Sequence, residues 1–180
     1  FTYYRFSTIF HRKGKPLSLS RNIATLFGVG TLRPAPGTWG SLVSLPAFYL
    51  IHVAGEFPLV VLATCAMFVF GWWATAEQTR DSLDHDPSEI VIDEVVGQWL
   101  ALWTISASAW RLEIDVLQLW PGWLAGFALF RMFDIFKPGP VGWADRRADA
   151  LGVMLDDVIA GVCAALCVAA MAAVAHGVLM

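Results

Sequence analysis

Long apolar runs alternate with short polar segments along the chain, and this pattern sets the predicted fold. Each run continues over three or more helical turns without an Asp, Glu, Lys or Arg, so each is predicted to be a helix. The run at 58–76 has nineteen such residues, enough for the ~30 Å hydrocarbon core of a membrane. The five runs are residues 42–54, 58–76, 95–110, 116–130 and 158–180.

The predicted fold class is all-α: a polytopic membrane helical bundle of about four to five spans, with a site at the cytoplasmic ends of the helices. The number of spans depends on the run at 42–54, which contains Pro46 and His52 and is short for a full crossing. Gly55-Glu56-Phe57 is predicted to be a tight external turn. Residues 1–22 are basic and are expected to form an N-terminal arm, and 23–180 a single membrane-embedded domain.

Composition supports a membrane protein. Hydrophobic residues make up 57% of the chain and charged residues 15%, against roughly 25% charged residues in soluble domains. The alternative is a very apolar soluble helical protein that buries one face in an oligomer, and a homo-oligomer is compatible with either reading. The net charge of −3 provides no basic surface for nucleic acid, which is therefore not an expected partner.

The distribution of charge predicts which end of the bundle faces the cytoplasm. With the N-terminus inside and five crossings, the inside segments are 1–41, 77–94 and 131–157. They hold eleven of the twelve Lys and Arg residues, and only Arg111 lies outside. This is a strong positive-inside bias. The three polar segments are therefore expected to meet on the cytoplasmic face.

Carboxylates are concentrated where the apolar helices meet these polar segments. Buried acids must be paired, protonated or metal-bound, so the groups predict a metal site. Oxygen ligands without a Cys or His cluster suit Mg²⁺. The candidate catalytic and metal-ligating residues are Asp93, Glu94, Asp134, Asp156 and Asp157.

Cations near these acids are candidate ligands for a phosphate group. Arginine offers a bidentate fork of donors and lysine a point charge. A Gly- and Pro-rich loop leads into a helix that we expect to be capped by Thr38 or Ser41, and amides at a helix N-terminus bind phosphate. The candidate phosphate-binding residues are Arg131, Lys137, Arg146, Thr38 and Ser41. Together with the acids they predict metal-assisted phosphoryl chemistry.

Other classes of function fit the pattern less well. No cysteine has an arginine six residues later, which argues against a thiolate phosphatase, and the four histidines are scattered. The main alternative is a small ion-coupled membrane transporter or channel that uses the acids as an ion path. That alternative predicts carboxylates near the middle of spans, whereas here they cluster at the ends.

The motifs, in their order along the chain, resemble the phosphatidylglycerophosphatase A family over residues 24–165. They are Pro36-Gly37-Thr38-Trp39-Gly40-Ser41, Ile90-Val91-Ile92-Asp93-Glu94-Val95-Val96-Gly97, the stretch from Phe130 to Pro138, Asp145-Arg146, and the stretch from Gly152 to Gly161.

This resemblance implies a Mg²⁺-dependent enzyme of the bacterial inner membrane with its active site facing the cytoplasm. Such an enzyme removes the terminal phosphate of the phospholipid phosphatidylglycerophosphate in the cytoplasmic leaflet, giving phosphatidylglycerol. The resemblance also implies that Mg²⁺ is held by Asp93 or Glu94, by Asp134, and by Asp156 or Asp157.

Overall fold

In the computed structural model of the chain, which describes residues 18–80 and 86–179, every regular element is a helix. The all-α prediction is therefore confirmed for this part of the chain. Residues 1–17 of the predicted basic arm lie outside the described residues. The elements are α1 (Leu19–Ala24), η1 (Val29–Thr31), α2 (Pro36–Thr79), α3 (Ile92–Ala101), α4 (Trp103–Leu112), η2 (Val116–Leu119), α5 (Trp120–Phe136), α6 (Pro140–Asp145) and α7 (Ala150–Leu179).

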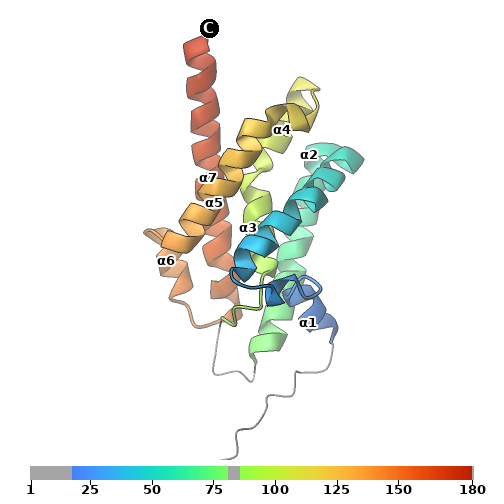
Figure 1. The fold of residues 1–180 in the computed structure, drawn as a ribbon, viewed down its shortest axis with the longest axis vertical. Coiled ribbons are helices and arrows are strands. Elements are labelled where there is room, and N and C mark those ends of the chain that lie inside the picture. Colours follow the sequence, from blue (N-terminus) through green and yellow to red (C-terminus); the bar gives the residue numbers. More distant parts are fainter. Residues whose placement is uncertain (1–17, 81–85, 180) are drawn as a thin grey trace, which may run out of the picture.

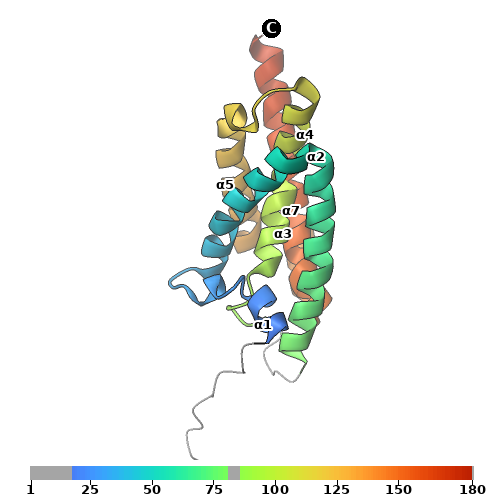
Figure 2. The same cartoon turned by 90° about the vertical axis from the view of Figure 1, so that its right-hand side faces the viewer.

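The element α2 is a pair of helical arms joined by a sharp turn. Gly55 (φ −164°, ψ 23°) and Glu56 (φ 56°, ψ −155°) leave helical geometry. Pro58 follows at once, in the first turn of the second arm, where its missing amide costs little. The chain turns back at this point, so both ends of α2 lie toward the same end of the molecule (Figures 1 and 2). The predicted turn at Gly55-Glu56-Phe57 is thereby confirmed.

The first arm begins earlier than the sequence suggested. We expected Thr38 or Ser41 to cap this helix, but α2 starts at Pro36 and its N-cap is Ala35, which makes no side-chain cap bond. Proline is favoured at the first helical position because its fixed φ suits a helix and an amide there has no partner within the helix. Thr38 and Ser41 therefore lie inside the helix, and the prediction that one of them is the cap was wrong.

Helix α3 forms the centre of the bundle. Eight of its ten residues are buried, and it is surrounded by α2, α5 and α7 (Figures 1 and 2). Apart from Asp93, Glu94 and Gln98 its residues are apolar, as expected of a helix in such a position. The Trp99 side chain donates a hydrogen bond of 3.0 Å to the carbonyl oxygen of Ser44, which ties α3 to the first arm of α2.

Two of the described helices, α2 and α7, are long and apolar enough to cross a membrane, fewer than the four to five predicted. The predicted span at 95–110 is divided at Leu102 into α3 and α4, and each has ten residues, about 15 Å of helix. The predicted span at 116–130 begins as the short η2, and α5 then runs from Trp120 to Phe136 with seventeen residues.

The described polar segments meet at one end of the bundle, as predicted. The start of α2, the start of α3, the end of α5 and the start of α7 all lie toward the lower end in Figure 1. The chain leaves α5 at Lys137, which has a left-handed conformation (φ 46°), and Pro138 follows it. Helix α5 therefore ends just before Pro138, as expected of a residue that cannot continue a helix. The bundle therefore brings its charged helix ends together.

Candidate active site

The first turn of α3 supplies two of the acids. The segment before it is held by the amide of Val91, which donates a 2.9 Å hydrogen bond to the carbonyl oxygen of Ala24 in α1. Helix geometry begins at Ile92, so Asp93 and Glu94 lie where the helix dipole favours negative charge. Asp93 is 7% exposed. The sequence thus places two carboxylates at the start of the most buried helix of the bundle.

Helix α7 brings a third carboxylate to the same place. Asp157 is 2% exposed and lies in the second turn of α7, which packs closely against α3. Asp93, Glu94 and Asp157 each offer a carboxylate oxygen, and these oxygens lie within 4.8 Å of one another. We call these three residues the acid cluster.

Burial makes the acid cluster costly unless a cation or protons neutralise it. Burial, followed by the charge of Glu94, raises the pKa of Asp93 well above its usual range. Burial also raises the pKa of Glu94 to about 8; the Asp157 and Asp134 carboxylates add to this effect, while a hydrogen bond with Asp93 and the charge of Arg131 oppose it. Three carboxylates this close cannot all ionise without a counter-charge.

Two oxygens of the acid cluster also lack a hydrogen-bond partner. Asp93 Oδ1 and Glu94 Oε2 are buried and unpartnered among the described residues. Unpartnered buried oxygens of this kind fit a bound cation, because a cation satisfies them without a donor. Oxygen ligands alone are the preference of Mg²⁺. The residues present therefore fit the Mg²⁺ site that the sequence predicts.

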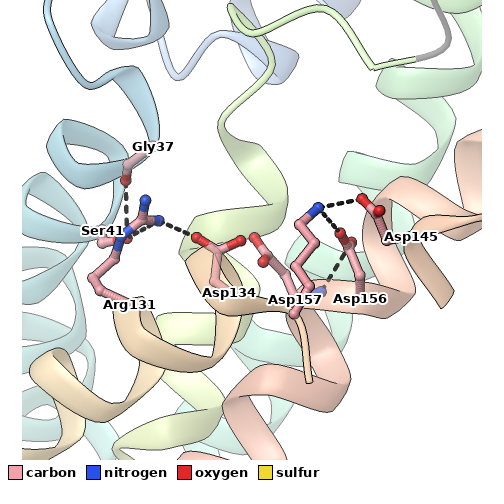
Figure 3. Close-up of polar contacts among 8 residues, drawn as sticks. Gly37, Ser41, Arg131, Asp134, Asp145, Asp156 and Asp157 are labelled. Carbon is pink, nitrogen blue, oxygen red and sulfur yellow. Dashed lines mark hydrogen bonds and ion pairs between the residues drawn. The ribbon is translucent and has the colours of Figure 1, made fainter. Parts of the chain in front are cut away.

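Arg131 and Asp134 form an ion pair beside the acid cluster. The guanidinium Nη1 of Arg131 lies 2.6 Å from Asp134 Oδ2 and also donates a 3.4 Å hydrogen bond to the Ser41 hydroxyl. Ser41 in turn donates to the carbonyl oxygen of Gly37, 2.9 Å away. Figure 3 shows this chain of contacts, with the carboxylate of Asp134 turned toward Asp157. Ser41 therefore positions Arg131 rather than capping a helix.

Lys137 is held by two carboxylates of its own. Its ammonium forms an ion pair with Asp145 of α6 and lies 2.8 Å from Asp156 Oδ2 of α7. Burial lowers the pKa of Lys137, but the two carboxylates outweigh burial and raise it above its usual value. Lys137 therefore braces the bundle by joining the end of α5 to α6 and α7. This structural role adds to the predicted contact with phosphate.

A cavity of about 310 Å³ joins these groups. Its walls include the whole acid cluster, the Arg131–Asp134 pair, Lys137 and Asp156, and the start of α2 at Ala35, Pro36 and Gly37. Seven of the ten predicted site residues line this cavity, and Thr38 and Ser41 do not. Arg146 lines a smaller neighbouring cavity of about 190 Å³, which shares Asp86 and Asp156 with the first. Thr38 lies in the first turn of α2, next to Gly37, and is partly buried.

The structure adds residues that the sequence analysis did not select. Gly37 lies so close to the site that a Cβ atom there would come 2.1 Å from Glu94 Oε1 and 3.1 Å from Arg131 Nη1. Asp145 completes the environment of Lys137, and Asp86 and Ser88 line the cavity. Of these residues, only Gly37 had a signal in the sequence, because a glycine can mark a place where the backbone comes close to another group.

A family model and several known proteins match most of this chain. The family model described as phosphatidylglycerophosphatase A matches residues 22–172. A phosphatidylglycerophosphatase A of Haemophilus influenzae is 36% identical over 149 residues, which cover 81% of this chain and 84% of that protein. The Escherichia coli phosphatidylglycerophosphatase A is 33% identical over 145 residues, or 79% of this chain and 77% of that protein.

A third relative has a different name. A Bacteroides thetaiotaomicron protein provisionally named a phosphatidylinositol-3-phosphatase is 35% identical over 153 residues, covering 82% of this chain and 90% of that protein. No solved structure matches the chain. The residues that the family model matches include the acid cluster, the Arg131–Asp134 pair and Lys137. The chain belongs to the phosphatidylglycerophosphatase A family.

Proposed function

We propose that the protein hydrolyses the terminal phosphate of phosphatidylglycerophosphate, with Mg²⁺ held by the acid cluster, to give phosphatidylglycerol and inorganic phosphate. One observation carries this proposal: the carboxylates of buried Asp93 and Asp157 and of partly buried Glu94 converge within 4.8 Å on a cavity that Arg131 also lines. A cation at the carboxylates and a guanidinium beside them form a receptor for a phosphomonoester dianion.

The acid cluster has one role in this proposal, which is to hold the cation. Bound Mg²⁺ supplies Lewis-acid polarisation of the phosphoryl group and neutralises its charge. Asp93 and Glu94 approach from α3 and Asp157 from α7, so two helices must be correctly packed for the ligands to converge. Asp134 and Asp156, the two other predicted ligands, already have cationic partners in Arg131 and Lys137.

Arg131 and the start of α2 are placed to bind the phosphate. The guanidinium is oriented by Asp134 and Ser41, and its Nε lacks a hydrogen-bond partner within the described residues. The first turn of α2 lines the cavity, and its cap Ala35 makes no side-chain hydrogen bond to the first amides of the helix. A helix N-terminus attracts anions, which adds to the charge of Arg131.

Asp134 is the candidate general base. Its carboxylate lies at the cavity wall between Arg131 and Asp157 (Figure 3). A carboxylate in this position would accept a proton from the water that attacks phosphorus. Attack by water would form the new bond to phosphorus and break the bond between phosphorus and the glycerol oxygen. The proton taken up by Asp134 would pass to that oxygen, so that the lipid leaves with a hydroxyl group.

We place the cavity at the cytoplasmic surface of a bacterial inner membrane. The two arms of α2, the α3–α4 pair, α5 and α7 would make five crossings, with the charged helix ends together at the cavity end. The positive-inside distribution of Lys and Arg supports this orientation. The carboxylates lie in the first turn of α3 and the second turn of α7, not at the middle of a span, which favours a hydrolase over an ion-coupled transporter.

The test is phosphate release by the purified protein in mixed micelles. Phosphatidylglycerophosphate should be hydrolysed with Mg²⁺ and not with a chelator. Phosphatidylinositol 3-phosphate, suggested by the name of the Bacteroides relative, serves as the competing substrate and should be hydrolysed at least about tenfold less efficiently, a difference of about 1.4 kcal/mol. Preference for the inositol lipid would overturn the substrate assignment.

A further inference from the structure

The wall of the phosphate cavity contains one apolar side chain that is also strongly exposed. Ile135 of α5 lines the cavity and is 62% exposed. Among the large exposed hydrophobic side chains that the structure describes, no other lines this cavity. Ile135 therefore joins the polar cavity to an apolar surface on the outside of α5.

That apolar surface continues along α5. Leu124, Ala128, Met132 and Ile135 are all exposed, and their spacing of four, four and three residues puts them on one face of the helix. We call these four residues the α5 stripe. It starts in the first turns of α5 and ends at the cavity.

The length of the α5 stripe matches that of a lipid chain. Leu124 and Ile135 are eleven positions apart, which is about 16 Å along a helix axis. This is about half of the ~30 Å hydrocarbon core, the depth of one leaflet. A lipid whose phosphate lies in the cavity would therefore have acyl chains of the right length to lie along the α5 stripe.

We propose that the α5 stripe binds the acyl chains of the substrate, so that the lipid enters the cavity past Ile135 without leaving its leaflet. This inference rests on the proposed function, and it names the part of the substrate that the carboxylates and Arg131 do not contact. The cavity takes the anionic headgroup, and the α5 stripe takes the hydrophobic part of the same molecule.

The test compares two substrates that share a headgroup. One is phosphatidylglycerophosphate in mixed micelles, and the other is its deacylated form, which carries the same phosphates but no acyl chains. The double variant Leu124→Ser with Met132→Ser should lower the ratio of kcat/KM for the diacyl substrate to that for the deacylated one by at least about tenfold. Leu62→Ser, on α2 and similarly exposed at 65%, is the matched control and should leave the ratio unchanged.

The unaltered protein provides a second measurement if the double variant does not fold. A phospholipid with a photoreactive group at the end of an acyl chain should cross-link to residues 124–135. Cross-linking to other helices, or a ratio that the double variant does not change, would overturn the inference while hydrolysis still supports the proposed function. If the unaltered protein hydrolyses neither substrate, the proposed function fails and the inference fails with it.

Discussion

Gly161 of α7 lies against the backbone of Gly97 in α3. A Cβ atom on Gly161 would come 2.3 Å from the carbonyl oxygen of Gly97 and 3.0 Å from its Cα. Asp157 precedes Gly161 by four residues, and Asp93 precedes Gly97 by four residues. Each carboxylate is thus about one helical turn from the crossing of the two helices. The contact between the two glycines sets how closely the acid cluster converges.

Gly161→Ala should therefore destabilise the protein and weaken the site together. The added methyl group forces α3 and α7 apart, and overpacking of this kind costs about 1–3 kcal/mol. Unfolding in detergent measures the first effect, and Mg²⁺-dependent phosphate release measures the second. Gly177→Ala in the same helix is the control, because a Cβ there meets no atom within 4 Å. If the two variants behave alike, the crossing does not position the site.

Asp157→Asn and Asp156→Asn should differ although the residues are adjacent. Asp157 belongs to the acid cluster, so Asp157→Asn should weaken Mg²⁺ binding by at least about tenfold, which is about 1.4 kcal/mol. Asp156 is paired with Lys137, so Asp156→Asn should lower the stability of the protein. It should reduce the affinity for Mg²⁺ less than Asp157→Asn does. Calorimetric titration of each variant with Mg²⁺ distinguishes them. Equal losses of affinity would assign both aspartates to the cation.

Stability without a divalent cation should fall as pH rises. The pKa of Glu94 is raised from 4.5 to about 8, so the folded protein retains a proton that the unfolded chain has already lost. The unfolded state then binds fewer protons, and stability declines between these two pKa values. Mg²⁺ replaces the proton, so its stabilising effect should increase with pH up to about 8.

Melting temperatures measured across this range, with Mg²⁺ and with chelator, check the pH dependence. The Glu94→Gln variant carries no titrating group at this position and should show a flatter profile with chelator. A melting temperature that rises with pH in the absence of divalent cations would contradict the assignment.

Lys137→Met should destabilise the protein by roughly 2 kcal/mol, because it leaves the buried Asp156 carboxylate without its cation. The two carboxylates raise the pKa of Lys137 against the opposing effect of burial. The contribution should therefore be constant at neutral pH and be lost only above the ordinary lysine pKa of 10.5. Arg147→Met, which breaks the exposed pair with Asp149, is the control and should have a much smaller effect. Equal losses of stability in chemical unfolding would contradict a bracing role for Lys137.

The structure brings together three of the acids that the sequence analysis selected, Asp93, Glu94 and Asp157, which stand where apolar runs meet polar segments. The sequence did not predict which acids pair with a lysine or arginine side chain and which do not. Which acids pair with cations depends on α6, a six-residue helix whose position brings Asp145 to Lys137. No periodicity in a segment that short shows where it packs.

The sequence predicted the class of the fold but not the lengths of its helices. Leu102 interrupts the run at 95–110 without a glycine or proline to mark the break. Helix α2 starts at Pro36, earlier than a cap at Thr38 or Ser41 would place it, because proline is favoured at the first position of a helix. Both differences concern the local conformation of the backbone. They lie within segments that the hydrophobic pattern correctly predicted to be helical.

The central claim is that the acid cluster holds the cation on which phosphate release depends. The most direct measurement is release from phosphatidylglycerophosphate across a Mg²⁺ titration by the unaltered protein, by Asp157→Asn, and by Asp149→Asn as an exposed carboxylate control. We predict saturable, chelator-sensitive activity for the first and third and a loss of at least about 100-fold for the second, about 2.7 kcal/mol. Phosphate release by Asp157→Asn at the rate and Mg²⁺ dependence of the unaltered protein would contradict the account.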